Sequence, residues 1–356
     1  MFTDIYFTRS KEVAKNFDIN PIVRYNVFFR KEGILCGARI AREILYNRLW
    51  RNPTVKMWSL LDGESFKKEE PVMLIQGQYQ DLVELETSIL SMLTLSGPAT
   101  NMKRLVDAAC GVPIIDMSAR HYPIMSEMAY AAYIGGAQGT STAEGYFSCD
   151  MLVNDESFTD RFKLFGSIPH CLNAVAGGSI ESAKLYRKTF PDQPLTVLTD
   201  YEGKEMDIIK EAVEVFGQDL SAIRLDTHGG RVHQGGSHGA CDVIPGYTPP
   251  IHANPYFAGK GVTIELYMRA RSLLDHMGAQ HTKIILSSGF NEEKIKAFLP
   301  FIDKERTMIG TGSWVGNMDY HPTMDIVRIK HKDGNWRNAL KEGREYTASA
   351  RLRRII

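Results

Sequence analysis

The sequence predicts an α/β protein of two domains, in which a parallel α/β barrel follows a mixed α/β segment. Length is the first observation, because 356 residues are typical of about two domains. From Val112 onward, short apolar runs alternate with helical segments, which is the pattern of parallel β/α units. Each of these runs also ends in small or polar residues. We expect six or seven such units closing into a barrel, and a doubly wound open sheet is the alternative.

Composition excludes several classes of function. The chain has 42 Lys+Arg and 42 Asp+Glu, so a net charge of zero gives no general signal for nucleic acid or a membrane surface. No run approaches 18 apolar residues, and the N-terminus lacks the apolar core of a signal peptide. The 5 Cys are scattered without a CxxC pair, which favours reduced thiols. We therefore expect a cytoplasmic protein.

The first 112 residues mix extended and helical segments. TDIYF, at residues 3–7, has the pattern of an edge strand, and residues 23–32 are also expected to be a strand. The segment that begins at Pro71 is expected to give a strand and then a polar turn. Apolar residues recur at helical spacing over 36–50. A long helix is expected before Cys110, with a kink or break at Ser96-Gly97-Pro98.

The second part supplies the barrel. Its strands are expected at residues 112–117, 163–168, 195–200, 222–226, 283–288 and 307–312. Its helices are expected at residues 123–134, 176–189, 205–216, 262–277 and 292–298. The tail from Met324 has two extended pieces around a turn at Asp333-Gly334, and we expect it to pair with the N-terminal sheet.

The strand ends supply candidate functional residues, because the loops that follow barrel strands converge on one mouth. Arg224 and Asp226 share a face of one strand end, where they could hold an anion and a hydroxyl or Mg²⁺; an ion pair within the barrel is the alternative. Residues 287–289 and 310–313 are rich in Gly and Ser and come last, where such barrels often bind phosphate; simple tight turns are the alternative. His170 follows another predicted strand. It is either a structural residue or an acceptor of a phosphoryl group.

A His- and Gly-rich loop follows Asp226 and Thr227. His228, His233, His238 and Cys241 could together bind zinc, but their spacing is irregular. A loop of this length is more often functional or disordered, so we expect it to cover a substrate.

A series of short segments occurs in the order found in one enzyme family. These segments are TDIYF (3–7), ELETSIL (84–90), SGPAT (96–100), DMSAR (116–120), GTST (139–142), GSIPH (166–170), VLTD (197–200), IRLDT (223–227), SSGFNEE (287–293), GTGS (310–313) and KEGR (341–344). Over nearly its whole length the chain resembles the nicotinate phosphoribosyltransferase family, especially the shorter archaeal-type members.

The resemblance implies an irregular α/β barrel, residues 113–324, and an open, partly antiparallel α/β domain built from residues 1–112 and 325–356. It implies a homodimer with shared active sites, or a higher oligomer, and no nucleic-acid or membrane partner. The implied reaction joins nicotinate to phosphoribosyl pyrophosphate, with Mg²⁺ on the pyrophosphate and ATP as a co-substrate. The chemistry is positioning and control of charge, since the sugar carbon becomes positive as pyrophosphate leaves.

The resemblance also assigns roles to residues of this chain. His170, Arg224 and Asp226 are implied as catalytic, with His170 phosphorylated when ATP hydrolysis is coupled to synthesis. The residues implied in substrate binding are Asp4, Tyr6, Arg120, Thr140, Ser141, Thr199 and Asp200. The residues implied in phosphate binding are Ser288, Gly289, Gly312, Ser313 and Lys341. Tyr6 would stack on the pyridine ring from the neighbouring subunit, with Asp4 beside it. No protein ligand set for a metal is predicted.

Two positions depart from the family pattern. Met117 stands where an aromatic residue is usual, and His121 stands where a second arginine is usual. A histidine is only partly charged at neutral pH, so recognition of the acceptor carboxylate could differ. Another pyridine, such as nicotinamide or quinolinate, is therefore an alternative acceptor, and a non-catalytic paralogue is a further alternative.

Overall fold

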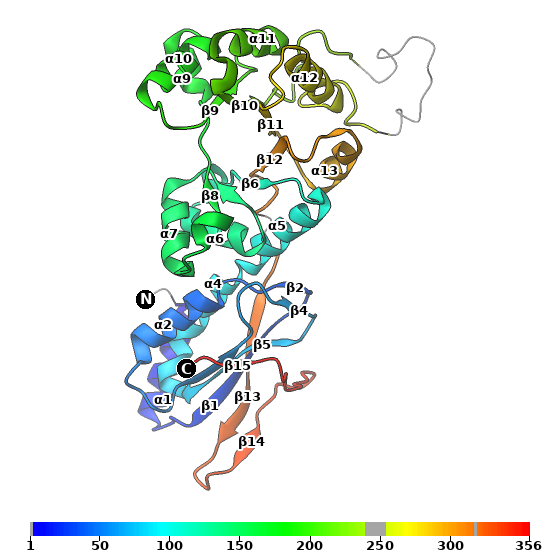
Figure 1. Cartoon of the computed structure of the whole chain (residues 1–356). Helices are drawn as coiled ribbons and strands as arrows, with labels where there is room; N and C mark the ends of the chain where they lie inside the picture. The colour runs from blue at the N-terminus through cyan, green and yellow to red at the C-terminus, as the bar shows by residue number, and fades with distance from the viewer. Residues whose placement is uncertain (1–2, 239–253, 317–318) are drawn as a thin grey trace. The chain divides into compact units, whose positions relative to one another are not determined.

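The computed structural model describes residues 3–238, 254–316 and 319–356, and it divides into two compact units (Figure 1). Unit 1 comprises Met1–Lys103, Ala131–Gly135 and Gly316–Ile356, and unit 2 comprises Arg104–Tyr130 and Gly136–Val315. Unit 1 is therefore built mainly from the two ends of the chain. The sheet of unit 1 is antiparallel and that of unit 2 is parallel, so the predicted fold class is confirmed. The predicted domains, residues 1–112 with 325–356 and residues 113–324, stay a prediction beside this division.

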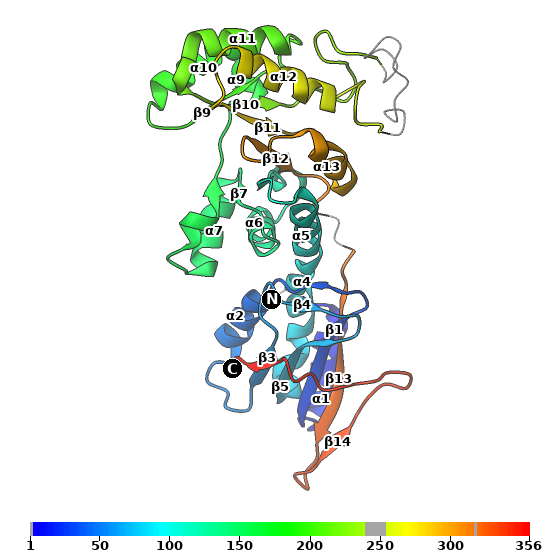
Figure 2. The same ribbon diagram turned by 45° about the vertical axis from the view of Figure 1, so that its right-hand side comes forward.

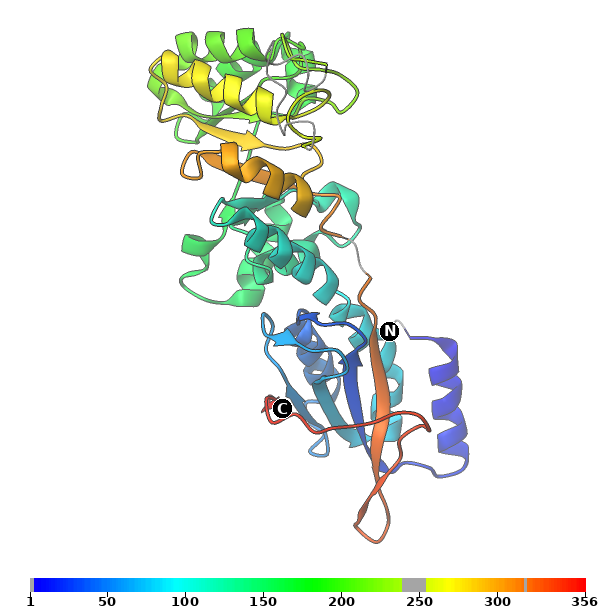
Figure 3. The same cartoon turned by 90° about the vertical axis from the view of Figure 1, so that its right-hand side faces the viewer.

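The sheet of unit 1 has the strand order β14-β13-β1-β5-β3-β15, and all its pairs are antiparallel. Its strands are β1 (Ile22–Phe29), β3 (Lys56–Ser59), β5 (Pro71–Gln78), β13 (Pro322–Lys330), β14 (Trp336–Asn338) and β15 (Arg353–Arg354). The other elements of this part are α1 (Ile5–Asn16), β2 (Gly33–Ile34), α2 (Ala38–Leu49), β4 (Ser65–Phe66), α3 (Tyr79–Leu82), α4 (Glu86–Leu93) and α5 (Ser96–Ala109). The prediction that the tail pairs with the N-terminal sheet is confirmed, because β13 lies beside β1 (Figure 3).

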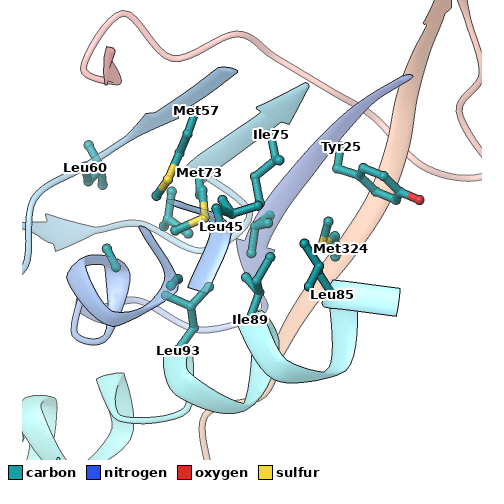
Figure 4. Close-up of a cluster of buried hydrophobic side chains, with 14 of the residues drawn as sticks. Tyr25, Leu45, Met57, Leu60, Met73, Ile75, Leu85, Ile89, Leu93 and Met324 are labelled. Carbon is teal, nitrogen blue, oxygen red and sulfur yellow. The ribbon is translucent and has the colours of Figure 1, made fainter. Parts of the chain in front are cut away.

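The core of unit 1 lies between this sheet and its helices. Figure 4 shows Ile89 and Leu93 of α4 pointing toward Met73 and Ile75 of β5, all fully buried. Apolar residues run almost without interruption along β5, which is buried over nearly its whole length. They recur at helical spacing along α4, so this helix has an apolar face to bury.

The prediction for the N-terminus is wrong. Residues 3–7 were expected to form an edge strand, but α1 begins at Ile5 and continues to Asn16. The five-residue pattern TDIYF favours a strand, whereas the longer segment RSKEVAKN contains mostly good helix formers. Asp4 lies in an extended conformation immediately before the helix, and Tyr6 lies in its first turn.

The predicted break in the helix is present, but it lies just before Ser96-Gly97-Pro98 and not within these residues. Helix α4 ends at Leu93 and α5 begins at Ser96. The Ser96 hydroxyl accepts from the Cys36 N–H at 3.0 Å, which ties the start of α5 to the chain before α2. Pro98 lies in the first turn of α5, where its missing N–H costs nothing.

The sheet of unit 2 contains seven parallel strands in the order β8-β7-β6-β12-β11-β10-β9. These are β6 (Ile114–Asp116), β7 (Gly139–Thr140), β8 (Lys163–Leu164), β9 (Leu195–Leu198), β10 (Leu220–Leu225), β11 (Lys283–Leu286) and β12 (Thr307–Thr311). Its helices are α6 (Met125–Ile134), α7 (Ala143–Val153), α8 (Phe158–Arg161), α9 (His170–Ala176), α10 (Ser179–Thr189), α11 (Glu205–Phe216), α12 (Ile264–His276) and α13 (Glu292–Phe298), of which α6 crosses the division between the units. Helices α10 and α11 pack beside β9 and β10 (Figures 1 and 2).

The parallel sheet is curled into an open barrel. Within the described residues, β8 and β9 pair on one side only, so the ring is open between them. The predicted strand over 163–168 is shorter than expected, since only Lys163 and Leu164 pair. None of the helices in the described parts of the chain has the length and hydropathy that a membrane crossing requires.

Candidate active site

A cavity of about 860 Å³ lies in unit 2, lined by residues at the carboxyl ends of the parallel strands and in the loops after them. Parallel strands bring their carboxyl ends to one edge, which is why segments far apart in sequence meet here. The cavity brings together most of the candidate residues, namely Arg120, Ser141, His170, Asp200, Arg224, Asp226, Ser288, Gly289, Gly312 and Ser313.

Arg224 and Asp226 form an ion pair on the wall of this cavity. Arg224 Nη2 lies 3.2 Å from Asp226 Oδ2, and Arg224 Nη1 donates to Ser167 Oγ at 2.5 Å. Ser287 Oγ donates to Asp226 Oδ1 at 2.8 Å. The structural and the functional interpretations of this pair are therefore compatible: the two side chains hold each other and both face the cavity.

His170 and Asp200 form a second hydrogen-bonded pair on the same wall. His170 Nε2 lies 3.2 Å from Asp200 Oδ1 and 3.3 Å from Oδ2. Burial raises the pKa of Asp200, the hydrogen bond and charge of His170 oppose this, and the charge of Asp226 adds to it. The His170 side chain is about half exposed, at 47%, so its ring is accessible from the cavity.

The two glycine-rich turns line the cavity for different reasons. Ser288 and Gly289 have consecutive positive φ angles, +76° and +71°, a conformation that favours glycine. Gly312 has a steric role instead, since a Cβ there would lie 2.7 Å from the Met117 carbonyl oxygen and 3.0 Å from the His121 ring. A Cβ at Gly310 would similarly meet the Met117 side chain at 2.5 Å.

Two candidate residues lie behind the lining. Thr140 is fully buried, and its hydroxyl donates to Asp116 Oδ2 at 2.9 Å. Thr199 is also fully buried, and its hydroxyl donates to the Arg224 carbonyl at 3.2 Å. Their neighbours Ser141 and Asp200 line the cavity, as expected where successive residues of a strand point to opposite sides.

Three further candidates, Asp4, Tyr6 and Lys341, belong to unit 1. Tyr6 and Lys341 line a separate cavity of about 410 Å³, and the Tyr6 hydroxyl donates to Asp4 Oδ2 at 3.0 Å. Glu86 lines the same cavity, and its pKa is raised to about 7 by burial and by the charges of Asp325 and Asp4. Whether these residues join the cavity of unit 2 in an assembly stays a prediction.

The His-rich loop is described in part. His228 lines the cavity, while His233 is buried and burial lowers its pKa. Cys241 lies outside the described residues. Over residues 3–238, 254–316 and 319–356, no group of His, Cys, Asp or Glu has the geometry of a metal site. The zinc hypothesis therefore has no support from the described part of this loop.

Two charged residues near the site were not singled out from the sequence. Glu205 is fully buried and binds Arg231, with Arg231 Nη2 2.6 Å from Glu205 Oε1. Lys294 is 8% exposed, and its Nζ donates to the Ser288 carbonyl at 2.9 Å. The one sequence signal for Lys294 is its spacing, because it shares a helical face with the apolar Phe298.

Comparison with known proteins agrees with this architecture. A family model described as "Quinolinate phosphoribosyl transferase, N-terminal domain" matches residues 4–96. The nicotinate phosphoribosyltransferase pncB1 of Mycobacterium tuberculosis is 26% identical over 306 residues, which are 80% of this chain and 58% of that protein. The chain thus spans less than two thirds of the length of this curated relative.

Solved structures extend the similarity over nearly the whole chain. The nicotinate-nucleotide pyrophosphorylase of Pyrococcus furiosus is 26% identical with a TM-score of 0.73, covering 96% of this chain and 77% of that one. Human nicotinic acid phosphoribosyltransferase, at 13% identity and a TM-score of 0.62 over 92% of this chain and 75% of that one, shares the fold. The two-unit fold is thus shared with these solved structures. In sequence, the relatives named here make the chain similar to the nicotinate phosphoribosyltransferase family.

Proposed function

We propose that this protein transfers the phosphoribosyl group of phosphoribosyl pyrophosphate to nicotinate, giving nicotinate mononucleotide and pyrophosphate for NAD synthesis. The observation that carries the proposal is the meeting of the Arg224–Asp226 pair, His170 and two glycine-rich turns around one cavity. The names of the M. tuberculosis and P. furiosus relatives support the same substrate class.

In the proposed reaction, different lining residues of the cavity bind different parts of the substrates. The Ser288-Gly289 and Gly312-Ser313 turns hold the 5′-phosphate, because a turn without bulky side chains lets backbone N–H groups approach an anion. Arg224 and Arg120 contact phosphate oxygens or the acceptor carboxylate, as guanidinium groups favour both. Asp226 accepts hydrogen bonds from ribose hydroxyls and stabilises the positive charge that develops on the sugar.

Mg²⁺ fits the carboxylates that are present. Asp200 and Asp226 both line the cavity, and burial raises the pKa of Asp200, with the charge of Asp226 adding to this. Mg²⁺ is usually bound by one or two carboxylates together with substrate phosphates, so a complete protein ligand set is not required. When bound, the ion would neutralise charge on the departing pyrophosphate.

His170 is the residue we propose for coupling to ATP. Its ring is exposed to the cavity, and Asp200 holds Nε2, which leaves Nδ1 as the nitrogen with a free lone pair in that tautomer. Transfer of the γ-phosphoryl group to this nitrogen would place negative charge next to Asp200 and change how the cavity binds pyrophosphate.

The second candidate function uses a different pyridine as the acceptor. His121 lines the cavity where the family usually has an arginine, and the match to the quinolinate N-terminal domain also favours this alternative. To distinguish the two functions, purified protein is incubated with phosphoribosyl pyrophosphate, Mg²⁺ and one acceptor at a time (nicotinate, quinolinate or nicotinamide), and the pyrophosphate released is measured. We expect release with nicotinate; release with quinolinate or nicotinamide alone would identify the alternative, and binding without release would indicate a non-catalytic paralogue.

We further propose that the protein acts as a homodimer with shared active sites. Helix α1 exposes Ile5, Tyr6 and Val13, each more than half accessible, which is unusual for an apolar surface in a monomer. Light scattering measures the mass, and a monomer at concentrations that support turnover would contradict the proposal. Mixing a Tyr6→Ala variant with a His170→Ala variant then tests whether the active sites are shared. If Tyr6 and His170 of one site come from different subunits, a mixed dimer contains one site with neither substitution, and activity is restored.

A further inference from the structure

We infer that Lys294 is a positioning residue of the phosphate end of the cavity: it fixes the Ser288-Gly289 turn from behind and supplies a buried positive charge beneath it. The inference rests on the proposed function in one respect, because it takes this turn as the phosphate-binding end. Lys294 does not line the cavity, so it acts through the turn and not by contact with the substrate.

The first observation is the contact between Lys294 and the turn. Lys294 Nζ donates to the Ser288 carbonyl at 2.9 Å. Ser288 is a non-glycine residue with a φ of +76°, a conformation that costs free energy unless other contacts maintain it. The Lys294 hydrogen bond, together with that of Ser288 Oγ to the Thr227 carbonyl at 3.3 Å, supplies such contacts.

The second observation is the burial of the charge. Lys294 is 8% exposed, and its Nζ lies 4.4 Å from the centroid of the Phe290 ring and 5.9 Å from that of Phe298. Lysine is almost never this buried unless a carboxylate pairs with it. Among the described residues Lys294 has no ion pair, and burial alone lowers its pKa to about 8. The aromatic faces compensate only part of the lost hydration.

The charged groups around Lys294 are engaged elsewhere. On its own helix, Glu292 pairs with Lys296 at 2.6 Å, and Glu293 hydrogen-bonds to Tyr256. On the neighbouring strand end, Asp226 binds Arg224 and Ser287. None of these groups contributes to the lowered pKa of Lys294, so no carboxylate compensates its charge.

An anion in the turn would supply the missing compensation. A dianionic phosphate monoester within a few ångströms of the ammonium group favours its charged form, because the protein between them screens far less than water. Lys294 should therefore take up a proton when a phosphate monoester binds near pH 8. The same linkage makes the affinity for the monoester fall as the pH rises through this range.

The test uses ribose 5-phosphate as the probe, because its binding does not depend on catalysis. Its affinity is measured by calorimetry between pH 7 and 9.5, where the phosphate is already a dianion, for the wild type, Lys294→Met, Lys294→Arg and Lys296→Met. Lys296 lies on the same helix but is exposed and paired with Glu292, so Lys296→Met is the matched control. We expect Lys294→Met to weaken binding about tenfold at pH 7.5 and to flatten the pH profile, with Lys294→Arg retaining affinity and Lys296→Met matching the wild type.

A second measurement needs no variant and covers the case in which Lys294→Met fails to fold. Titrations of the wild type at pH 8 in buffers of different ionisation enthalpy report the protons taken up on binding. An uptake between about 0.3 and 0.7 protons supports the inference, and no uptake overturns it. Equal affinities and parallel pH profiles for Lys294→Met and the wild type would also overturn it. If ribose 5-phosphate binds in a Lys294-dependent way but no acceptor releases pyrophosphate, the proposed function fails and the inference stands.

Discussion

Glu205 allows a quantitative test of how the loop after β10 is held near the site. Three donors converge on its fully buried carboxylate: Arg231 Nη2 at 2.6 Å, Thr227 Oγ1 at 2.7 Å and the Gln234 N–H at 3.0 Å. Removing the carboxylate leaves Arg231, whose side chain is 32% exposed and stays partly hydrated, so the cost should lie at about 2–4 kcal/mol, toward the low end for a buried pair. In Glu205→Gln, an amide NH₂ also replaces an oxygen that accepted from these donors. At roughly 2–4 °C per kcal/mol for a domain of this size, the Tm should fall by about 4–16 °C.

Thermal unfolding followed by circular dichroism at pH 7.5 measures this change. The control is Glu211→Gln, which removes an exposed carboxylate from the same helix. Burial would raise the pKa of Glu205, but the bonds from Arg231, Gln234 and Thr227 outweigh burial and lower it. The stabilisation by Glu205 is therefore present above pH 4.5, the ordinary pKa of a glutamate, and is lost as the pH falls below it. The Tm values of the wild type and of Glu205→Gln should therefore converge in acid.

The double variant Glu205→Gln/Arg231→Met separates this pair from the rest of the loop. We expect it to be less destabilised than the sum of the single variants by about 0.5–3 kcal/mol, because the second substitution removes the uncompensated charge. A Glu205→Gln variant as stable as Glu211→Gln, or strict additivity in the double variant, would refute the reasoning.

Three further predictions concern the site and unit 1. His170→Ala should abolish any stimulation by ATP while leaving the Tm within a few degrees, as measured by pyrophosphate release with and without ATP; unchanged stimulation would exclude the phosphohistidine. Gly312→Ala should raise the KM for phosphoribosyl pyrophosphate at least tenfold and cost about 1–3 kcal/mol of stability, because its Cβ would lie 2.7 Å from the Met117 carbonyl oxygen. The control is Gly229→Ala, since a Cβ at Gly229 has open space around it. Equal KM values for the two variants would contradict the prediction. Glu86→Gln should stabilise the protein more at pH 8 than at pH 5. The pKa of Glu86 is raised from 4.5 to about 7, so the native state loses stability as the pH rises from 4.5 to 7. Urea titrations at pH 5 and pH 8 measure the free energy of unfolding, and a difference between variant and wild type that does not change with pH would count against the prediction.

The regular part of the fold follows from sequence pattern. The predicted helices at 205–216 and 292–298 match α11 and α13 in both bounds, because each has a clear apolar face and a polar boundary. Strands whose apolar runs are buried on both sides, such as β11, were predicted for the same reason. TDIYF failed as a prediction because a five-residue pattern does not include the helix-forming residues that follow it.

The candidate site was predictable at the level of strand ends but not of single side chains. The convergence of parallel strands explains why Asp200, Asp226 and Gly289 meet, and the sequence alone indicates this edge. Which member of a neighbouring pair faces the cavity depends on the pleat, so Ser141 lines it and Thr140 does not. The roles of Glu205 and Lys294 depend on contacts with Arg231 and with the Ser288 carbonyl, which lie in loops outside the helices that carry the two residues, and no helical or strand pattern specifies such contacts.

The position of β1 in the antiparallel sheet has a consequence for how the protein is made. This strand lies between β5, which the ribosome completes early, and β13, which begins only at Pro322. Throughout synthesis of the intervening residues, one side of β1 has no hydrogen-bonding neighbour, although Val23, Tyr25 and Val27 are apolar and buried in the finished sheet. An unpaired apolar edge of this kind is prone to self-association. Nascent chains that stop short of Pro322 should therefore depend on chaperones, however well their later β/α segments have already folded.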